Sequence, residues 1–150
     1  MKQQRLCIIG IGSPYAEDSL GLRLIQRLAR RELPPWVEFR ALDRPGLALL
    51  ERMQGFERVI LLDLLPQLAS GEIRELALDE LECQASPLSD HSLGVAETLA
   101  LGRVLGDLPR SLRILGLGPV EEVDDPLLDR LLRLCISGRE QTSPAAWPVD

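Results

Sequence analysis

The stretch from residue 6 to residue 31 constrains the fold more than any other part of the chain. It begins with an apolar run, residues 6–11, that is short enough for a buried strand. The turn signal Gly12-Ser13-Pro14 interrupts this run. After Glu17 and Asp18, apolar residues recur at helical spacing, with polar residues on the opposite face. The stretch therefore predicts a strand, a loop with two carboxylates and a helix, which is the opening unit of an open α/β sheet.

The remaining sequence continues the alternation of strand and helix patterns. Residues 59–62 are all apolar and end at Asp63, as expected for a central parallel strand buried on both faces. Residues 72–78 alternate, which is typical of an edge strand, and their short link to the preceding strand favours an antiparallel hairpin with it. The other expected elements are strands at 37–41 and 113–117, helices at 19–31, 45–53 and 93–105, and a last helix with a stripe of Leu128, Leu131, Leu132 and Cys135. The long helix is expected to turn Ala96, Leu99, Ala100 and Val104 inward.

This order of elements predicts an α/β fold. We expect a three-layer α/β/α sandwich around a twisted, mostly parallel five-stranded sheet with one antiparallel edge strand. Right-handed crossovers place the first strand between the second and the third. Ligands of such folds bind at the carboxyl ends of the strands, where the strand order reverses. Residues 1–140 are expected to form a single domain, and residues 141–150, rich in Pro and Ala, a flexible carboxyl-terminal tail.

Charge and composition exclude several classes of partner. The 17 basic and 23 acidic residues give a net charge of −6, which argues against nucleic acid and anionic membranes as partners. The three cysteines have neither metal-knuckle nor redox spacing, so we expect free thiols in a reducing compartment. The chain begins without a signal-peptide pattern and contains no apolar run long enough for a bilayer. These features predict a cytoplasmic location.

Two common ligand motifs do not fit the glycine turn. A dinucleotide fingerprint beginning at Gly10 would need a third glycine where the chain has Tyr15. A phosphate-binding P-loop needs Gly-Lys-Ser or Gly-Lys-Thr, which the chain lacks. Nucleotide binding thus has little support.

Three side chains are better candidates for chemistry. Asp18 follows the first strand, Asp63 ends the third, and His91 stands before the long helix and is the only histidine. Two carboxylates and one imidazole suit nickel, zinc, iron or manganese, with coordination positions left open. We expect their oxygen and nitrogen atoms to lie within roughly 8 Å of one another. The structural alternatives are a helix cap at Asp18, a turn contact at Asp63 and a surface position for His91.

The motifs around these residues resemble the maturation endopeptidases of nickel–iron hydrogenases. The resemblance lies in Gly10-x-Gly12-Ser13-Pro14, Glu17-Asp18-Ser19-Leu20-Gly21, Leu61-Leu62-Asp63 and His91-Ser92-Leu93-Gly94, and extends from about Leu6 to about Leu134. It implies that Asp18, Asp63 and His91 are the metal-contacting and catalytic residues. The sequence departs from the family at Ser13, where asparagine is usual, and the loop before Asp18 is one residue short.

A second departure concerns the substrate. Asp43-Arg44-Pro45-Gly46 stands where many members of the family have a longer glycine-rich loop that helps to form the substrate cleft. The resemblance implies a substrate-binding role for Asp43. This loop is two residues shorter here.

The resemblance also implies a function. The protein would recognise nickel in the hydrogenase large-subunit precursor and remove its carboxyl-terminal extension, with the nickel carried by the substrate. Water activation by the metal and general-base help from Asp63 or Asp18 both stay open. The alternative is a non-catalytic, metal-dependent binding module or chaperone on the same fold.

Overall fold

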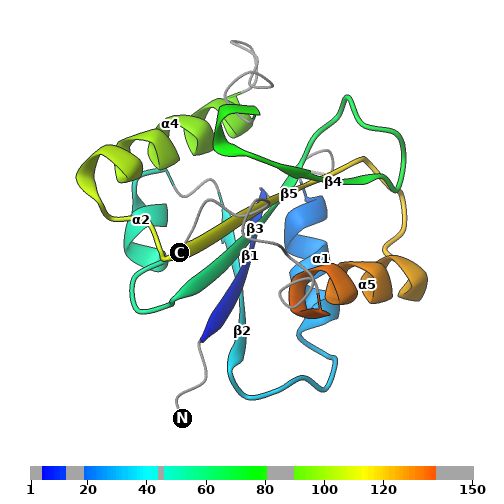
Figure 1. Cartoon of the computed structure of the whole chain (residues 1–150). Coiled ribbons are helices and arrows are strands. Elements are labelled where there is room, and N and C mark those ends of the chain that lie inside the picture. The colour runs from blue at the N-terminus through cyan, green and yellow to red at the C-terminus, as the bar shows by residue number, and fades with distance from the viewer. Residues whose placement is uncertain (1–4, 13–18, 44–45, 81–89, 138–150) are drawn as a thin grey trace.

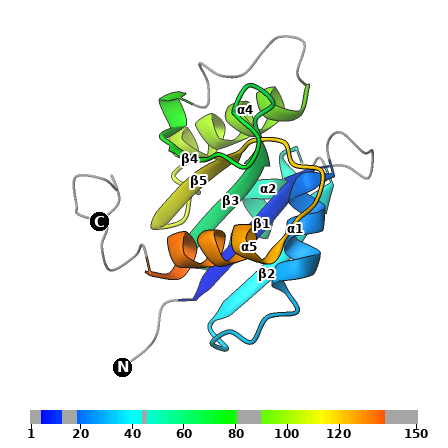
Figure 2. The ribbon, with the colours of Figure 1, turned by 90° about the vertical axis from the view of Figure 1, so that its right-hand side faces the viewer.

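The computed structural model describes residues 5–12, 19–43, 46–80 and 90–137, with the backbone alone at 90–94. It contains a five-stranded sheet with the strand order β2-β1-β3-β5-β4. Helices α1 and α5 lie against one face and α2 and α4 against the other (Figures 1 and 2). The expected three-layer sandwich is confirmed. The elements in chain order are β1 (Leu6–Gly12), α1 (Leu20–Leu28), β2 (Val37–Asp43), α2 (Ala48–Arg52), β3 (Arg58–Leu64), β4 (Ile73–Leu76), α4 (Asp90–Leu105), β5 (Ser111–Leu117), α5 (Asp125–Leu132) and a π-helical segment, Arg133–Ser137.

Strands β1, β2, β3 and β5 are parallel, so their carboxyl ends share one edge of the sheet. The first strand is central, between β2 and β3, as its sequence predicts. Every residue of β1 and of β3 is buried. This burial explains their nearly uninterrupted apolar runs, because both faces of these strands are covered by helices.

The partner of the antiparallel edge strand differs from the prediction. β4 pairs with β5 and not with β3, whose two edges are occupied by β1 and β5. The link after β3 runs past the end of β5, where the Leu65 amide donates to the Leu117 carbonyl (2.8 Å) and the Gly118 amide to the Glu72 carbonyl (2.8 Å). The predicted hairpin with the third strand was therefore wrong, although the edge position was right.

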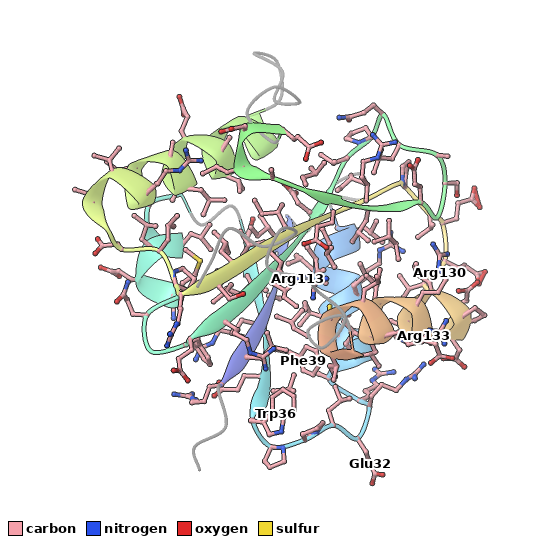
Figure 3. The ribbon with its side chains drawn as sticks, in the orientation of Figure 1. Glu32, Trp36, Phe39, Arg113, Arg130 and Arg133 are labelled. Atoms are coloured by element: carbon pink, nitrogen blue, oxygen red, sulfur yellow. The ribbon has the colours of Figure 1, made fainter. Side chains whose placement is uncertain are left out.

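An ion pair between buried Arg113 and exposed Glu75 reinforces the pairing of β4 with β5. Arg113 of β5 is 6% exposed, and its Nη2 lies 3.1 Å from Oε1 of Glu75 in β4. Its Nη1 donates to the Leu134 carbonyl (2.7 Å), so the same guanidinium contacts the π-helical segment (Figure 3). Buried arginine is uncommon unless it is paired. The contact therefore joins one edge of the sheet to the end of the α5 layer.

The sheet separates two apolar layers. Cys7, Ile9 and Ile11 of β1 pack toward α2 and α4, and Leu6 and Ile8 toward α1 and α5. This alternation is the two-residue period of a strand. Trp36, just before β2, and Phe39, within it, pack at the border of the α1–α5 layer (Figure 3).

Helix α4 ends at Leu105, as predicted, but differs from the prediction at its start and in the side chains that it buries. It begins at Asp90, so His91 lies in its first turn rather than before it. Ala96 and Leu99 are buried and Ala100 is half-buried, but Val104 is 82% exposed. The predicted inward position of Val104 was wrong, because the buried stripe of the helix ends at Gly102, which contacts Leu50 of α2 and Leu108.

Several predictions concern residues outside the ranges that the structure describes. The tail, residues 141–150, Asp18 and Cys83 lie outside the described residues. Cys7 and Cys135 are free and buried, as expected. Within the described ranges, no helix is long and apolar enough to cross a membrane.

Candidate active site

Asp63 is a buried carboxylate at the carboxyl edge of the sheet. It stands one residue before the end of β3, opposite Gly116 of β5, and is 1% exposed. By the alternation of the strand it shares a face with Val59 and Leu61, which pack toward α2 and α4. Asp63 is thus at the edge of the sheet where folds of this class bind their ligands.

The beginning of α4 lies on the same side of the sheet. Val95 and Leu99 belong to the apolar layer between α4 and the sheet. Position 91 precedes them by four and eight residues, so the backbone places it on the same helical stripe, in the first turn. The side chain of His91 lies outside the described part of the structure, as does all of Asp18.

Two glycines bring α1 against the end of β1. A Cβ atom on Gly10 would lie 2.3 Å from the Gly21 carbonyl oxygen, and one on Gly21 would lie 2.4 Å from the Ile11 carbonyl oxygen. Both contacts are with backbone, which cannot turn aside as a side chain can. Gly10 and Gly21 are therefore explained by a close approach of strand and helix, without a bound dinucleotide.

Arg23 ties the start of α1 to the connection between β5 and α5. Its Nε donates to Ser19 Oγ (3.1 Å), Nη1 to the Glu121 carbonyl (3.1 Å) and Nη2 to the Val120 carbonyl (3.4 Å). In the sequence, Arg23 is one of the polar residues opposite the apolar face of the helix predicted at 19–31. Its spacing from Arg27 and Arg31, four and eight residues away, was the signal that could have indicated that the three arginines contact one segment, which the structure shows to be residues 120–129.

Asp43 is at the same edge of the sheet but is separated from Asp63 by β1. It is the last residue of β2, exposed, and paired in register with Gly12. Two strands apart, Cα atoms are about 10 Å from each other. The alternation of β2 places Asp43 with Val37 and Phe39, toward α1 and α5, whereas Asp63 faces the α2–α4 layer. A substrate that contacts both would have to cross the edge of the sheet.

The metal site itself stays a prediction. Among the described side chains, no three His, Cys, Asp or Glu residues are grouped closely enough to hold a metal ion. Asp18 and the imidazole of His91 are not in that set. The buried thiols are poor ligands near neutral pH, because burial raises the pKa of Cys7 to about 11 and that of Cys135 to about 12.

Comparisons with known proteins agree with the fold and the motifs. No family model matches the chain. The hydrogenase 2 maturation protease of Escherichia coli is 26% identical over 145 residues, which cover 85% of this chain and 88% of that protein. The hydrogenase expression/formation protein HupD of Thiocapsa roseopersicina is 30% identical over 129 residues, and the match covers 80% of this chain but 56% of HupD.

The structure is similar to that of HybD, the hydrogenase maturating endopeptidase of E. coli. The two share 26% identity with a TM-score of 0.70, and the match covers 91% of this chain and 93% of HybD. A hydrogenase maturation protease from Thermococcus kodakarensis, HycI, has the same fold with a TM-score of 0.58. The strand order, the motif-bearing strand ends and these relatives agree, and the chain belongs to the hydrogenase maturation endopeptidase family of hydrolases.

Proposed function

We propose that this chain recognises nickel in the large-subunit precursor of a nickel–iron hydrogenase and removes the precursor's carboxyl-terminal extension. The observation that carries the proposal is the buried carboxylate of Asp63 at the carboxyl edge of the sheet, on the face against which α4 packs. That helix has the only histidine of the chain in its first turn. Family membership supports the reaction class.

The burial of Asp63 supports a functional role for it. An aspartate that is 1% exposed is uncommon in a protein core unless its charge is compensated. A cation is one such compensation. With Asp18 and His91, Asp63 would offer two hard oxygen ligands and one imidazole nitrogen, an incomplete set that leaves positions for the ligands that hold nickel in the precursor.

The same residues have a role in hydrolysis. Asp63, Asp18 and His91 would fix the nickel of the precursor beside the scissile bond, at the edge of the sheet. Water is then activated either by polarisation at the nickel or by proton transfer to Asp18 or Asp63. Asp43, from the other side of β1, would contact the polypeptide of the precursor. The buried free thiols fit a reducing compartment, and we place the reaction in the cytoplasm.

The decisive experiment is cleavage of a purified large-subunit precursor, with and without nickel, followed by mass spectrometry of the products. We expect release of the carboxyl-terminal extension from the nickel-loaded precursor alone. Efficient cleavage of the nickel-free precursor under strict chelation would contradict metal recognition and would indicate a carboxylate pair, Asp18 and Asp63, working as in aspartic proteases. Nickel-dependent binding without cleavage would favour the binding-module alternative.

A further inference from the structure

The contacts of Arg23 join two segments that meet at the carboxyl edge of the sheet. One guanidinium contacts Ser19, at the start of α1, and the carbonyls of Val120 and Glu121, which are 97 and 98 residues away in the chain. These carbonyls follow closely on Leu117, the last residue of β5. The side chain of Arg23 is half-buried, so part of its charge is removed from water. Hydrogen bonds from a charged donor are stronger than neutral ones.

The side-chain hydrogen bond of Ser19 is unusual for a serine that directly precedes a helix. A serine before a helix normally accepts a hydrogen bond from a backbone amide of the first turn. Ser19 makes no such cap, and its backbone is already helical, with φ −87° and ψ −3°. Its hydroxyl accepts from Arg23 Nε instead, while its carbonyl accepts from the Arg23 amide (2.9 Å). Arg23 thus contacts the residue next to Asp18 through both backbone and side chain.

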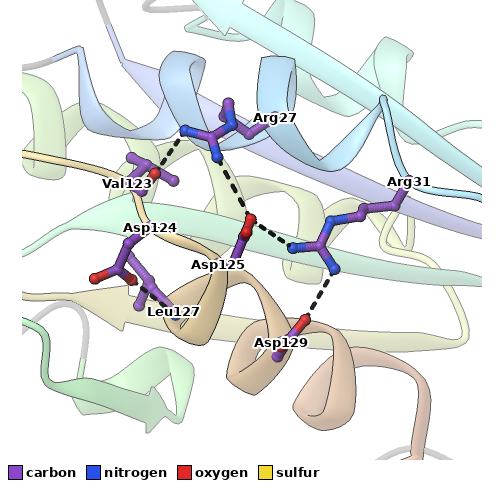
Figure 4. Close-up of polar contacts among 7 residues, drawn as sticks. All are labelled: Arg27, Arg31, Val123, Asp124, Asp125, Leu127 and Asp129. Carbon is purple, nitrogen blue, oxygen red and sulfur yellow. Dashed lines mark hydrogen bonds and ion pairs between the residues drawn. The ribbon is translucent and has the colours of Figure 1, made fainter.

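Arg27, farther along α1, and Arg31, three residues beyond its end, have other partners. Arg27 Nη1 donates to the Val123 carbonyl (2.6 Å), and Arg31 donates to Asp129 (2.8 Å) and Asp125 (3.1 Å), as Figure 4 shows. The contacts of Arg31 are with α5 itself. This guanidinium therefore ties the turn after α1 to α5, away from the carboxyl ends of the strands, and provides a matched control for Arg23.

We propose that Arg23 is a positioning residue for precursor cleavage: it fixes Ser19, at the start of α1, against the connection between β5 and α5. In the sequence, Ser19 directly follows Asp18, a predicted metal ligand. The inference rests on the proposed function. Arg23 need not touch the substrate. It would act by setting the place of a predicted metal ligand relative to Asp63, and a displacement of about 1 Å in a catalytic group is enough to lower a rate about 100-fold.

The test compares Arg23→Met with Arg31→Met, which removes the ion pairs between the turn after α1 and helix α5. With the nickel-loaded precursor we expect Arg23→Met to lower kcat at least 10-fold while KM changes less than threefold. Arg31→Met should keep kcat within twofold of wild type. Ser19→Ala should lower kcat by a smaller factor, and adding it to Arg23→Met should have little further effect, because both changes remove the same contact.

A second measurement does not depend on cleavage. In the free protein, Arg23→Met should accelerate amide hydrogen exchange at residues 19–23 and 120–123, and Arg31→Met should not. Exchange rates in these segments that match wild type, or a kcat of Arg23→Met within twofold of wild type, would overturn the inference. Equal losses of kcat in both variants would also overturn it, because they would indicate a general structural role. If wild type fails to cleave, the proposed function is refuted, and the exchange experiment still decides whether Arg23 anchors these segments.

Discussion

The two helical layers are attached to the sheet by different kinds of contact. On the α1–α5 side, backbone meets backbone at Gly10 and Gly21. Arg27 of α1 donates to the Val123 carbonyl before α5, and Arg31, in the turn after α1, binds a carboxylate of α5. On the α2–α4 side the described contacts are mainly apolar, and α4 ends with exposed Val104 and Leu105. Directional contacts fix one layer in register, whereas apolar packing is non-directional. The predicted ligands are divided between the layers, since Asp18 leads into α1 while Asp63 and His91 belong to the α2–α4 side.

The sharpest way to break this comparison is to add one methyl group on each side. Gly21→Ala places a Cβ 2.4 Å from the Ile11 carbonyl oxygen, so α1 must move away from β1. We expect the free energy of unfolding to fall by at least about 3 kcal/mol, or the chain not to fold. Urea denaturation followed by circular dichroism measures this change.

Gly102→Ala is the matched change on the other side. Its Cβ would lie 2.7 Å from the ends of the Leu50 and Leu108 side chains, which can rotate. In a helix interior, alanine is also more favourable than glycine by about 1 kcal/mol, which offsets part of the strain. We expect a loss of under about 1.5 kcal/mol. Equal losses in the free energy of unfolding for Gly21→Ala and Gly102→Ala would show that the two layers are attached to the sheet in the same way.

The next largest effect is expected on cleavage activity when a candidate catalytic residue on the α2–α4 side is replaced. His91→Ala should reduce cleavage of nickel-loaded precursor at least about 100-fold, because no other imidazole is available in the chain. Its free energy of unfolding should change by no more than about 1 kcal/mol, since a residue in the first turn of a helix contributes little to the core. Product mass spectrometry and urea denaturation check the two parts.

Asp63→Asn provides the companion variant. It keeps the size of the buried side chain and removes its charge, so we expect a folded protein that does not cleave the precursor. A folded Asp63→Asn or His91→Ala protein with wild-type activity would end the proposed metal site.

Substitution of Asp43 should have a smaller effect, confined to binding of the substrate. Because it is exposed at the end of β2, Asp43→Asn should cost under about 1 kcal/mol of stability. If Asp43 contacts the precursor, KM should rise about 3- to 10-fold, the loss of roughly one hydrogen bond, with kcat nearly unchanged. Steady-state kinetics separates the two parameters. Loss of the folded state would instead show that Asp43 is structural.

Local patterns in the sequence predicted most of the fold. The apolar runs at residues 6–11 and 59–62 identified two strands buried on both faces, and the alternation at 72–78 identified an edge strand. Its partner was not predictable in this way, because β4 follows β3 closely in sequence while β5 occupies the adjacent edge. Pairing depends on which strand already has two neighbours, and no local pattern contains that information.

In the candidate site, too, some features were predictable from local sequence patterns and others were not. The position of Asp63 at a strand end followed from the apolar run before it. The contacts of Arg23 with Val120 and Glu121 did not, because they join residues almost a hundred positions apart through backbone carbonyls, which have no sequence signature. The start of α4 at Asp90 was missed because helix ends are the least certain part of any pattern.

The smallest effect at neutral pH concerns the two buried thiols, one on each side of the sheet. Burial raises the pKa of Cys7, in the α2–α4 layer, to about 11 and that of Cys135, in the α1–α5 layer, to about 12, from an ordinary value of 9.0. The unfolded chain therefore ionises first as pH rises. The contribution of each thiol to stability is complete below pH 9 and is lost as pH rises toward its folded pKa.

We expect native protein at pH 8 to react with iodoacetamide at Cys7 and Cys135 at least about 100-fold more slowly than unfolded protein, in a Cys83→Ser background that leaves only these two thiols. If the α2–α4 layer opens more readily than the layer held by arginines, Cys7 should be alkylated before Cys135 at low urea concentration. Mass spectrometry of the peptides gives the order. Earlier alkylation of Cys135 would show that the α1–α5 layer, with its polar contacts, opens more readily than the apolar α2–α4 layer. That result would reverse the comparison.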